Sequence, residues 1–325
     1  MQMRLPEWLL KATDTLLHGV STNAMAAAYT RLSDDYRSGR PTLAGDKAEM
    51  FWLAYLCGRM PGTFAAVSSV LSEIPPELLK ECGSMLDLGS GPGTASWAAI
   101  ELLPELKAIQ GLEADPAARE LANKLAKKAP FKPEFSAGDL NLSVVELAEA
   151  DLVVAAYASS ELHESQREAF YQKAWAKTKR LLVLVEPGTP AGFAAVLQAR
   201  ALLLQAGAKM VAPCPGGMDC PMKDMSPTRW CHFSQRLERN RLGQILKGGE
   251  LGYEDEKFSY LVFSKQPALP SPGRIMNFPK KLKGHLKLEL CTTDGLVMKT
   301  QSKKDGALYK AARKSRWGDA WPPRP

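Results

Sequence analysis

The stretch Ser84-Met85-Leu86-Asp87-Leu88-Gly89-Ser90-Gly91-Pro92-Gly93-Thr94 decides the fold of this chain. Its first five residues predict a strand. The glycines that follow allow a tight turn in which the backbone approaches a ligand at the start of the next helix. A dinucleotide fingerprint would place its third glycine at position 94, whereas here that glycine stands one residue earlier and Pro92 precedes it. This spacing favours S-adenosylmethionine over NAD.

Strand and helix patterns alternate on the carboxyl side of this stretch. The predicted strand and helix pairs are 84–88 with 95–103, 108–113 with 116–129, 152–156 with 165–178, and 181–186 with 192–205. A helix at 241–246 and a strand at 258–264 are expected to complete the sheet. Repeated strand-then-helix units predict an α/β fold around a parallel sheet with right-handed crossovers.

Three further regions accompany this sheet. Residues 1–80 are expected to form a helical N-terminal region, because apolar residues recur there at helical spacing. The sheet domain would span 81–265, interrupted at 209–240 by an insertion rich in Pro, Cys and Met. Prolines then mark a linker, and strands at 285–291 and 295–301 predict a small, basic, β-containing C-terminal module at 266–325.

Composition bounds the class of protein. The chain has 325 residues, 45% of them hydrophobic and 24% charged, as in an ordinary soluble globular protein. No apolar run approaches the roughly 18 residues of a membrane span, and residues 1–10 show neither a signal peptide nor an Arg-rich transit pattern. We therefore expect a cytoplasmic, bacterial-type, monomeric protein with no membrane partner.

The positive charge of the chain is concentrated at one end. Lys and Arg number 42 against 35 Asp and Glu overall, but 14 against 4 from residue 265 onward. Such asymmetry indicates a polyanionic partner such as nucleic acid; the alternative is a soluble charged tail. Trp317 and Trp321 could stack on unpaired bases, or Trp317 could anchor packing. The candidate phosphate-binding residues are Lys280, Lys281, Lys283, Lys287, Lys303, Lys304, Lys310, Arg313, Lys314 and Arg316.

The glycine stretch resembles motif I of the class I methyltransferases, whose sheet is Rossmann-like. The resemblance implies that Asp87 helps to hold the methionine end of S-adenosylmethionine. Glu113 has the place of the carboxylate that accepts both ribose hydroxyls, and Asp139 with Leu140 the place beside the adenine. The candidate cofactor-binding residues are Asp87, Gly89, Ser90, Gly91, Pro92, Gly93, Glu113, Asp139 and Leu140.

The fourth strand carries no familiar catalytic signature. Amino-methylating enzymes often have an Asn-Pro-Pro-Tyr type clamp there, and cytosine C5 enzymes a Pro-Cys nucleophile. Residues 156–162 instead read Ala-Tyr-Ala-Ser-Ser-Glu-Leu. Tyr157, Glu161 or His163 could line an acceptor pocket, although Glu161 and His163 could equally be solvated surface groups. The sequence therefore names no catalytic residue.

Six cysteines in such a chain point to thiol or metal chemistry rather than to disulfides. Cys57 and Cys82 belong to apolar helical segments, where we expect them to pack as small hydrophobes. The other four, which suit either tetrahedral zinc or a 4Fe-4S cluster, are Cys214, Cys220, Cys231 and Cys291. The lack of closely spaced pairs, and the proline after two of them, favours iron and sulfur. His232 and His285 are spare candidates for zinc.

Six motifs together resemble the methyltransferase-like factors of mitochondrial small-ribosomal-subunit assembly and their bacterial relatives. They are Tyr36-Arg37-Ser38-Gly39, residues 59–67, the loop at 86–94, residues 214–233, residues 284–291 and Arg316-Trp317-Gly318-Asp319. The resemblance spans nearly the whole chain. It implies that the four cysteines bind a 4Fe-4S cluster and that the partner is the small ribosomal subunit or its RNA, not DNA.

Three functions are compatible with these features. The first is an S-adenosylmethionine-dependent RNA methyltransferase, or methyltransferase-like factor, acting on the small ribosomal subunit. The second is a non-catalytic RNA-binding assembly factor that retains the cofactor fold and the cluster. The third is a methyltransferase with a protein or small-molecule acceptor.

Overall fold

One mixed sheet organises the body of the protein. The computed structural model describes residues 4–38, 48–140, 147–216, 219–225, 227–239, 241–248 and 251–323; Gly39, from the first family motif, lies outside them. The strands follow the order β3-β2-β1-β4-β5-β8-β6, and β7 pairs with β8. They are β1 Ser84–Leu88, β2 Ala108–Glu113, β3 Glu134–Ala137, β4 Ala150–Ala156, β5 Thr178–Pro187, β6 Lys209–Ala212, β7 Phe233–Glu238 and β8 Tyr253–Ser264.

The sheet is mixed, so the expectation of a purely parallel sheet is wrong at one side. Strands β1 to β5 pair in parallel, whereas β8 runs antiparallel to β5, β6 and β7. Only a short helix, α10 Arg241–Lys247, separates β7 from β8, and a connection that short favours antiparallel pairing. Five parallel strands in this order, followed by an antiparallel strand beside the fifth, form the Rossmann-like class I methyltransferase α/β fold.

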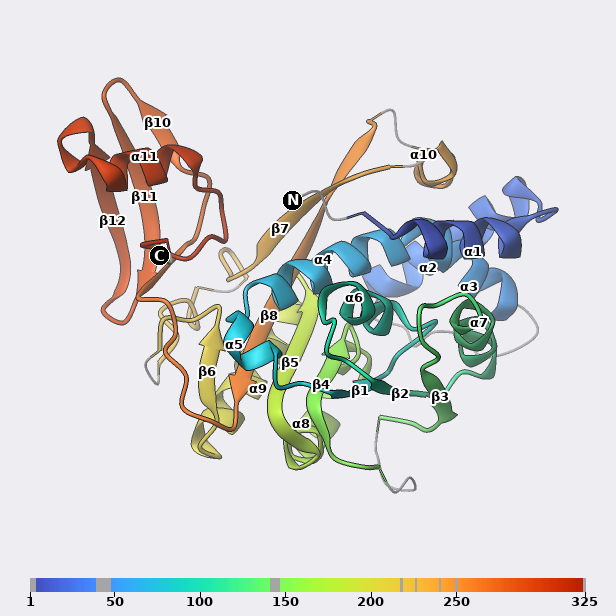
Figure 1. Ribbon diagram of the computed structural model, residues 1–325. Helices are drawn as coiled ribbons and strands as arrows, with labels where there is room; N and C mark the ends of the chain where they lie inside the picture. Colours follow the sequence, from blue (N-terminus) through green and yellow to red (C-terminus); the bar gives the residue numbers. More distant parts are fainter. Residues whose placement is uncertain are drawn as a thin grey trace.

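Helices cover both faces of this sheet (Figure 1). Alternate residues of β5 belong to two separate cores: Val183 packs among side chains of α3, α4 and α6, and Leu184 among those of α8 and α9. Central strands buried on both faces are therefore continuously apolar. The flanking helices are α6 Thr94–Leu102, α7 Pro116–Ala126, α8 Glu164–Ala176 and α9 Pro190–Gln205.

The N-terminal region is helical, as expected. Its helices are α1 Glu7–Leu17, α2 Thr22–Ser38, α3 Ala48–Gly58, α4 Met60–Ser72 and α5 Pro76–Leu79. Most side chains of α3 and α4 are buried, because these helices pack on α6 and α7 below and on α1 and α2 above. Cys57 and Cys82 are buried within this region and pack as small hydrophobes. No helix in the described part of the chain is long and apolar enough to cross a membrane.

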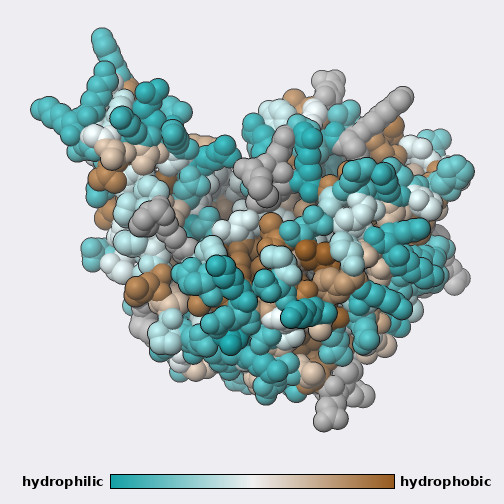
Figure 2. Space-filling view, in the orientation of Figure 1, coloured by the Kyte–Doolittle hydropathy of each residue, from teal (hydrophilic) through white to brown (hydrophobic). Residues whose placement is uncertain are grey.

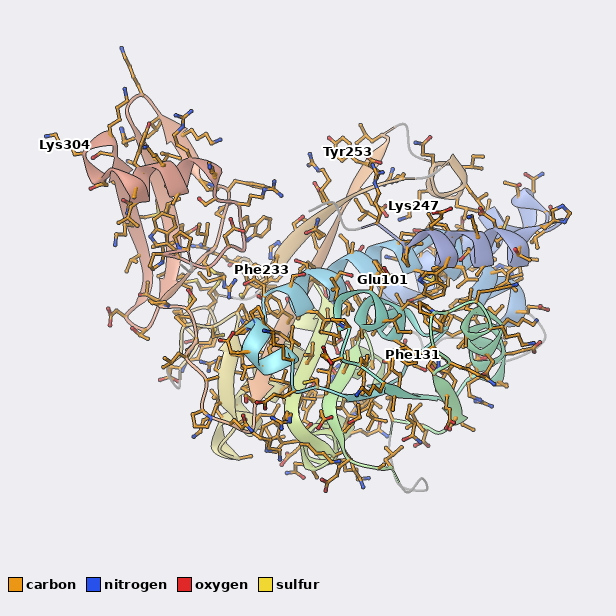
Figure 3. The ribbon with its side chains drawn as sticks, viewed as in Figure 1. Glu101, Phe131, Phe233, Lys247, Tyr253 and Lys304 are labelled. Atoms are coloured by element: carbon orange, nitrogen blue, oxygen red, sulfur yellow. The ribbon has the colours of Figure 1, made fainter. Side chains whose placement is uncertain are left out.

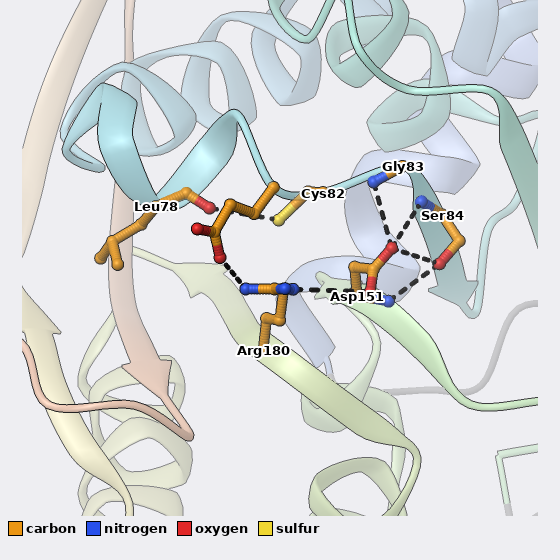
Figure 4. A network of polar contacts seen from close by, with 7 residues as sticks. Leu78, Cys82, Gly83, Ser84, Asp151 and Arg180 are labelled. Atoms are coloured by element: carbon orange, nitrogen blue, oxygen red, sulfur yellow. Dashed lines mark hydrogen bonds and ion pairs between the residues drawn. The ribbon is translucent and has the colours of Figure 1, made fainter.

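A polar network fixes the amino ends of three strands (Figure 4). One carboxylate oxygen of Asp151 on β4 accepts hydrogen bonds from the backbone N–H groups of Gly83 and Ser84, at 3.1 and 3.0 Å, and from the Ser84 hydroxyl at 2.8 Å. Arg180 on β5 pairs with Glu81 and lies 3.8 Å from the other Asp151 oxygen. These contacts set the register of β1 against β4 at the end opposite the glycine loop.

A second sheet forms a separate C-terminal lobe, which stands at the upper left of Figure 1. We use the name C-terminal lobe for residues 273–321. Its core consists of only a few buried side chains, among them Ile275, Leu288 and Trp321. Trp321 is 3% exposed, so it cannot stack on a base, contrary to one expectation. The elements are β9 Gly273–Ile275, β10 Lys280–Leu282, β11 His285–Thr292, β12 Gly295–Ser302, η2 Lys303–Asp305 and α11 Ala307–Lys314.

Arg274 joins this lobe to the body. Its guanidinium is 1% exposed and donates to the carbonyl oxygens of Pro213 at 3.0 Å and Gly318 at 2.7 Å. It also pairs with Glu73, just after α4, at 2.5 Å. One residue thus links the start of the cysteine-rich segment, the N-terminal helices and the last loop of the chain.

Candidate functional site

The loop between β1 and α6 depends on three glycines. Gly89, Gly91 and Gly93 have φ values of +70°, +53° and +85°, which favour glycine. A β-carbon at Gly89 would lie 2.9 Å from that of Ala158, and one at Gly93 within 2.8 Å of Trp97 and Phe135. A β-carbon at Gly91 would meet only ordinary contacts, the nearest with the Trp52 ring at 3.6 Å. The loop is therefore packed from beneath and more open at its middle glycine.

Glu113, the last residue of β2, holds this loop. Its Oε2 accepts a hydrogen bond from the Gly91 N–H at 2.8 Å, and its Oε1 accepts one from the Asp115 N–H at 2.8 Å. Burial raises the pKa of Glu113, and these backbone bonds oppose the rise. A carboxylate oxygen has more than one lone pair, so both oxygens can still accept from a vicinal diol.

Asp87, near the end of β1, is fully enclosed. One of its oxygens accepts from the Ser96 N–H and hydroxyl, at 3.1 and 2.7 Å, which ties β1 to α6. Burial raises the pKa of Asp87 to about 6. The other oxygen, Oδ1, is buried and has no hydrogen-bond partner among the described residues. A buried orphaned acceptor is costly, so a bound donor there would remove a penalty.

A cavity of about 360 Å³ opens above the glycine loop. The carboxyl ends of β1, β2 and β4 form its floor, which is where ligands bind in open α/β sheets. Helices α3 and α4 supply Trp52, Tyr55 and Thr63 to its wall. These three residues were not predicted as site residues, because they belong to helices without a ligand motif and only the packing of α3 and α4 over the loop brings them to the cavity.

Most of the predicted cofactor-binding residues line this cavity. The lining includes Asp87, Gly89, Ser90, Gly91, Glu113, Asp139 and Leu140. Pro92 and Gly93 do not line the cavity; they are buried, and the Pro92 carbonyl accepts from the Trp97 indole N–H at 2.8 Å. These two residues shape the turn from beneath.

Tyr157 follows the carboxyl end of β4 and is one of the three residues that the sequence offered for an acceptor pocket. It lines the cavity and has a φ of +59°, an uncommon value for a bulky residue. Its hydroxyl donates to Glu256 Oε1 at 2.9 Å. Burial, and then the charge of Glu256, raise the pKa of Tyr157 far above its ordinary value. Strained backbone of this kind gathers at functional sites.

Of the other two acceptor candidates, only Glu161 lies in the cavity. Glu161, in η1 Ser159–Glu161, lines the cavity. Burial raises its pKa to about 8, with further contributions from the carboxylates of Glu113 and Glu186. His163 is exposed, is not part of the lining and caps α8 by accepting from the Ser165 N–H at Nδ1. The reading of His163 as a surface group therefore applies, whereas Glu161 belongs to the site.

The four cysteines singled out by the sequence lie around one region beside the lobe. Three of them, Cys220, Cys231 and Cys291, pack against the same small core of Phe193 and Met222. Burial raises the pKa of Cys231 far above its ordinary value, and the nearby thiols of Cys214, Cys220 and Cys291 raise it further. No two of the described cysteines form a disulfide.

The described residues contain no group of three or more Cys, His, Asp or Glu side chains arranged to hold a metal ion. His232 stacks on Trp230 and meets Trp317 edge-on, and burial lowers its pKa. His285 begins β11 and Cys291 nearly ends it, so the two lie about 20 Å apart at 3.3 Å per residue. This separation removes His285 from the candidate ligands.

The candidate phosphate-binding residues are all on the surface of the C-terminal lobe. Lys280, Lys281, Lys283, Lys287, Lys303, Lys304, Lys310, Arg313, Lys314 and Arg316 are exposed. Figure 2 shows hydrophilic side chains covering this lobe, and Lys304 points outward from its edge in Figure 3. Trp317 is only half-buried and packs edge-on against His232 and Phe278, as an anchor would.

Comparison with known proteins gives a family match and several relatives. The family model described as "Mitochondrial small ribosomal subunit Rsm22" matches residues 50–322. The human mitochondrial ribosome assembly protein METTL17 is 31% identical over 298 residues, which cover 83% of this chain and 62% of the human protein. Ribosome assembly protein RSM22 of Saccharomyces cerevisiae is 24% identical over 178 residues, covering 35% of this chain and 28% of that protein. The chain thus spans less than two thirds of the length of these relatives.

Solved structures resemble the fold only distantly. Magnesium protoporphyrin IX methyltransferase of Synechocystis, with bound SAM, has a TM-score of 0.42 at 15% identity, covering 72% of this chain and 90% of that one. A TehB-like SAM-dependent methyltransferase of Corynebacterium glutamicum has a TM-score of 0.38 at 14% identity, covering 73% and 95%. Similarity at this level bears on neither ligand nor activity.

The relatives correct one prediction. The matched family is described as mitochondrial, and the human and yeast relatives are named as mitochondrial proteins. The expectation of a bacterial, cytoplasmic protein is therefore wrong for this family. The expectation rested on composition, on the shortness of the apolar runs and on residues 1–10. None of these records the compartment in which a globular domain works.

Proposed function

The chain belongs to the mitochondrial small ribosomal subunit Rsm22 family, and we propose that it is an S-adenosylmethionine-binding, methyltransferase-like factor that acts on the small ribosomal subunit or its RNA. One observation carries the proposal. A chain that matches this family over residues 50–322 also has a cavity at the carboxyl ends of its strands, above a glycine loop that Glu113 holds.

The cavity supports cofactor binding through its donors and acceptors. Glu113 would accept from the ribose hydroxyls, and Asp139 with Leu140 would lie beside the adenine. Asp87 and the backbone of Gly89, Ser90 and Gly91 would hold the methionine end, which the orphaned Asp87 Oδ1 supports. The cofactor, when bound, supplies an electrophilic methyl group. We assign it to the 81–265 domain, with 1–80 covering the cavity and 266–325 as a basic module.

The four cysteines are proposed to hold a 4Fe-4S cluster. The charges of Cys214, Cys220 and Cys291 all act on Cys231, so the four thiols lie within electrostatic reach of one another. The described side chains as they stand form no group that could hold a metal ion, so binding would have to draw the four thiols together. The insertion at 209–240 and β11 would then be joined through the cluster.

A metal analysis tests this assignment. An anaerobic preparation is expected to be brown, with broad visible absorption and iron and sulfide in equal amounts. Colourless protein with one zinc per chain would refute it. Cys291→Ser is expected to lose the colour and to speed proteolysis beyond residue 265. Cys82→Ser should keep the absorption, because Cys82 is buried and none of the four candidate ligands shifts its pKa.

The basic residues of the C-terminal lobe are proposed to bind ribosomal RNA. Their exposure and their concentration in one small lobe support phosphate contacts that fix position without reading sequence. If about six of them neutralise phosphates, affinity should fall roughly a thousandfold between about 50 and 200 mM salt. Crosslinking to the RNA of the small subunit at increasing salt measures this loss of binding.

Methyl transfer to RNA is the favoured activity, and a non-catalytic assembly factor is the second candidate. A specific observation favours the second: Tyr157 stands where a catalytic clamp is expected, and its hydroxyl is already bonded to Glu256. Mass spectrometry of ribosomal RNA from a deletion strain separates the two. A lost methyl mark that wild type restores and Gly91→Arg does not restore would establish transfer. Unchanged marks would leave the assembly role. If RNA failed to compete for binding at low salt, a protein or small-molecule acceptor would be favoured instead.

A further inference from the structure

The cavity above the glycine loop has a strongly one-sided charge. Five carboxylates line it and no Lys or Arg of the described chain does so. The five are Asp87, Glu113, Asp115, Asp139 and Glu161. Three of them make structural hydrogen bonds. Asp115 caps α7 through the Ala117 and Ala118 N–H groups, Glu113 holds the loop, and one oxygen of Asp87 ties β1 to α6 through Ser96.

Glu161 has no such duty. Its carboxylate forms no hydrogen bond or ion pair with any described residue, and the charges that act on it, from Glu113 and Glu186, have the same sign as its own. Its side chain lines the cavity and is reached by water, while the protein atoms packed around it desolvate the carboxylate. Burial and these two carboxylates raise its pKa to about 8. A cation in the cavity would remove that penalty.

Buried orphaned atoms give an independent sign of a ligand. Asp87 is 1% exposed and lines the cavity, yet its Oδ1 has no partner among the described residues. The indole N–H of Trp52, which is 7% exposed, also has none. Trp52, Tyr55 and Tyr157 also line the cavity, and aromatic side chains are common partners of cations.

We propose that this cavity selects the sulfonium cofactor, S-adenosylmethionine, over its thioether product, S-adenosylhomocysteine, with Glu161 as the residue that makes the distinction. The inference rests on the proposed cofactor site. The two ligands have the same adenosine and the same amino acid end, and they differ by one methyl group and one positive charge. The carboxylate can distinguish the two ligands only through that extra charge, and we expect the Coulombic attraction to contribute about tenfold in affinity.

This selectivity determines what the occupied cavity reports. If the pocket bound both ligands equally, its occupancy would depend on their total concentration. A pocket that prefers the cation fills according to the supply of methyl donor, whether or not the protein transfers the methyl group. Product would also leave the cavity readily after any transfer.

Calorimetry with three ligands tests the proposal at fixed salt and at a pH just above the pKa of about 8 of Glu161, so that its carboxylate is charged. The ligands are S-adenosylmethionine, S-adenosylhomocysteine and sinefungin, which replaces the sulfonium by a carbon bearing an ammonium group. The variants are Glu161→Gln and Glu164→Gln. The second is a matched control, because Glu164 is exposed on α8 outside the cavity and its loss changes the net charge equally.

Wild type and Glu164→Gln are expected to bind the two cations about tenfold or more tightly than the thioether. Glu161→Gln should lose most of that difference by weakening the cations while leaving the thioether unchanged. Equal binding of all three ligands by wild type would overturn the inference and keep the cofactor site. An unchanged preference in Glu161→Gln would overturn the role of Glu161. If no ligand binds, the proposed cofactor site itself fails.

Discussion

Replacing Arg274 by Met should release the C-terminal lobe from the body. The guanidinium is almost fully buried and has three partners, the carbonyl oxygens of Pro213 and Gly318 and the carboxylate of Glu73. Removing one member of a buried pair costs about 3–5 kcal/mol. The Glu73 side chain is 31% exposed and can take up water, so we expect the lower end, about 3 kcal/mol.

That free energy predicts a measurable change in lobe opening. About 3 kcal/mol raises the open population roughly a hundredfold, since each 1.4 kcal/mol is tenfold. Native-state proteolysis in the linker around Leu269, which is 92% exposed, tracks the open population when opening is fast relative to cleavage. Arg313→Met, on the exposed side of α11, is the matched control and should cleave at the wild-type rate. A cleavage rate for Arg274→Met within twofold of wild type would refute this reasoning.

Three further predictions concern the body and the basic surface. Asp87→Asn should gain stability relative to wild type as pH rises from 4 to 7, by at most about 3 kcal/mol in urea unfolding. The folded pKa of Asp87, about 6, exceeds the ordinary 3.8, so ionisation at higher pH destabilises wild type and cannot occur in the variant. Gly93→Ala should cost about 1–3 kcal/mol more than Gly284→Ala in thermal unfolding. Both glycines have a positive φ, but only at Gly93 would the new β-carbon meet aromatic rings within 3 Å. Equal losses of stability in the two variants would contradict this account of the packing. Replacing Lys303 and Lys304 by Ala should reduce the salt slope of RNA binding by about 1.4, and an unchanged slope would remove these lysines from the interface.

The sequence predicted the elements that have a strong local signal. Strands β1 and β2 have the bounds expected from 84–88 and 108–113. β1 ends directly before Gly89, and β2 ends shortly before the Asp115-Pro116 start of α7, so both strands have a clear local stop signal. Strands β3, β6 and β7 of the sheet were not predicted. β6 and β7 lie at the two ends of the 209–240 segment that was expected to be irregular, because its Pro, Gly and Cys residues dominate the local pattern.

The site shows the same division between local and non-local signals. The glycine loop and Glu113 follow from a motif and from its spacing to the next strand. Trp52 and Tyr55 do not, because their segment is apolar throughout and only the packing of α3 on the loop turns them toward the cavity. Arg274 is a similar case. In the sequence it is one more basic residue of the C-terminal part, and in the fold it is the one described Arg of that part that is fully buried.

The distribution of charge separates two kinds of recognition within the chain. The C-terminal lobe presents exposed lysines and arginines, and the cavity presents five carboxylates and no described Lys or Arg. Phosphates favour the first surface and are repelled by the second, whatever the acceptor of a methyl group proves to be. An RNA held by the lobe could therefore offer the cavity only an uncharged group, such as an unstacked base. If the proposed RNA binding is right, the attachment of the lobe through Arg274 matters for function, because it fixes the distance between the basic surface and the cavity.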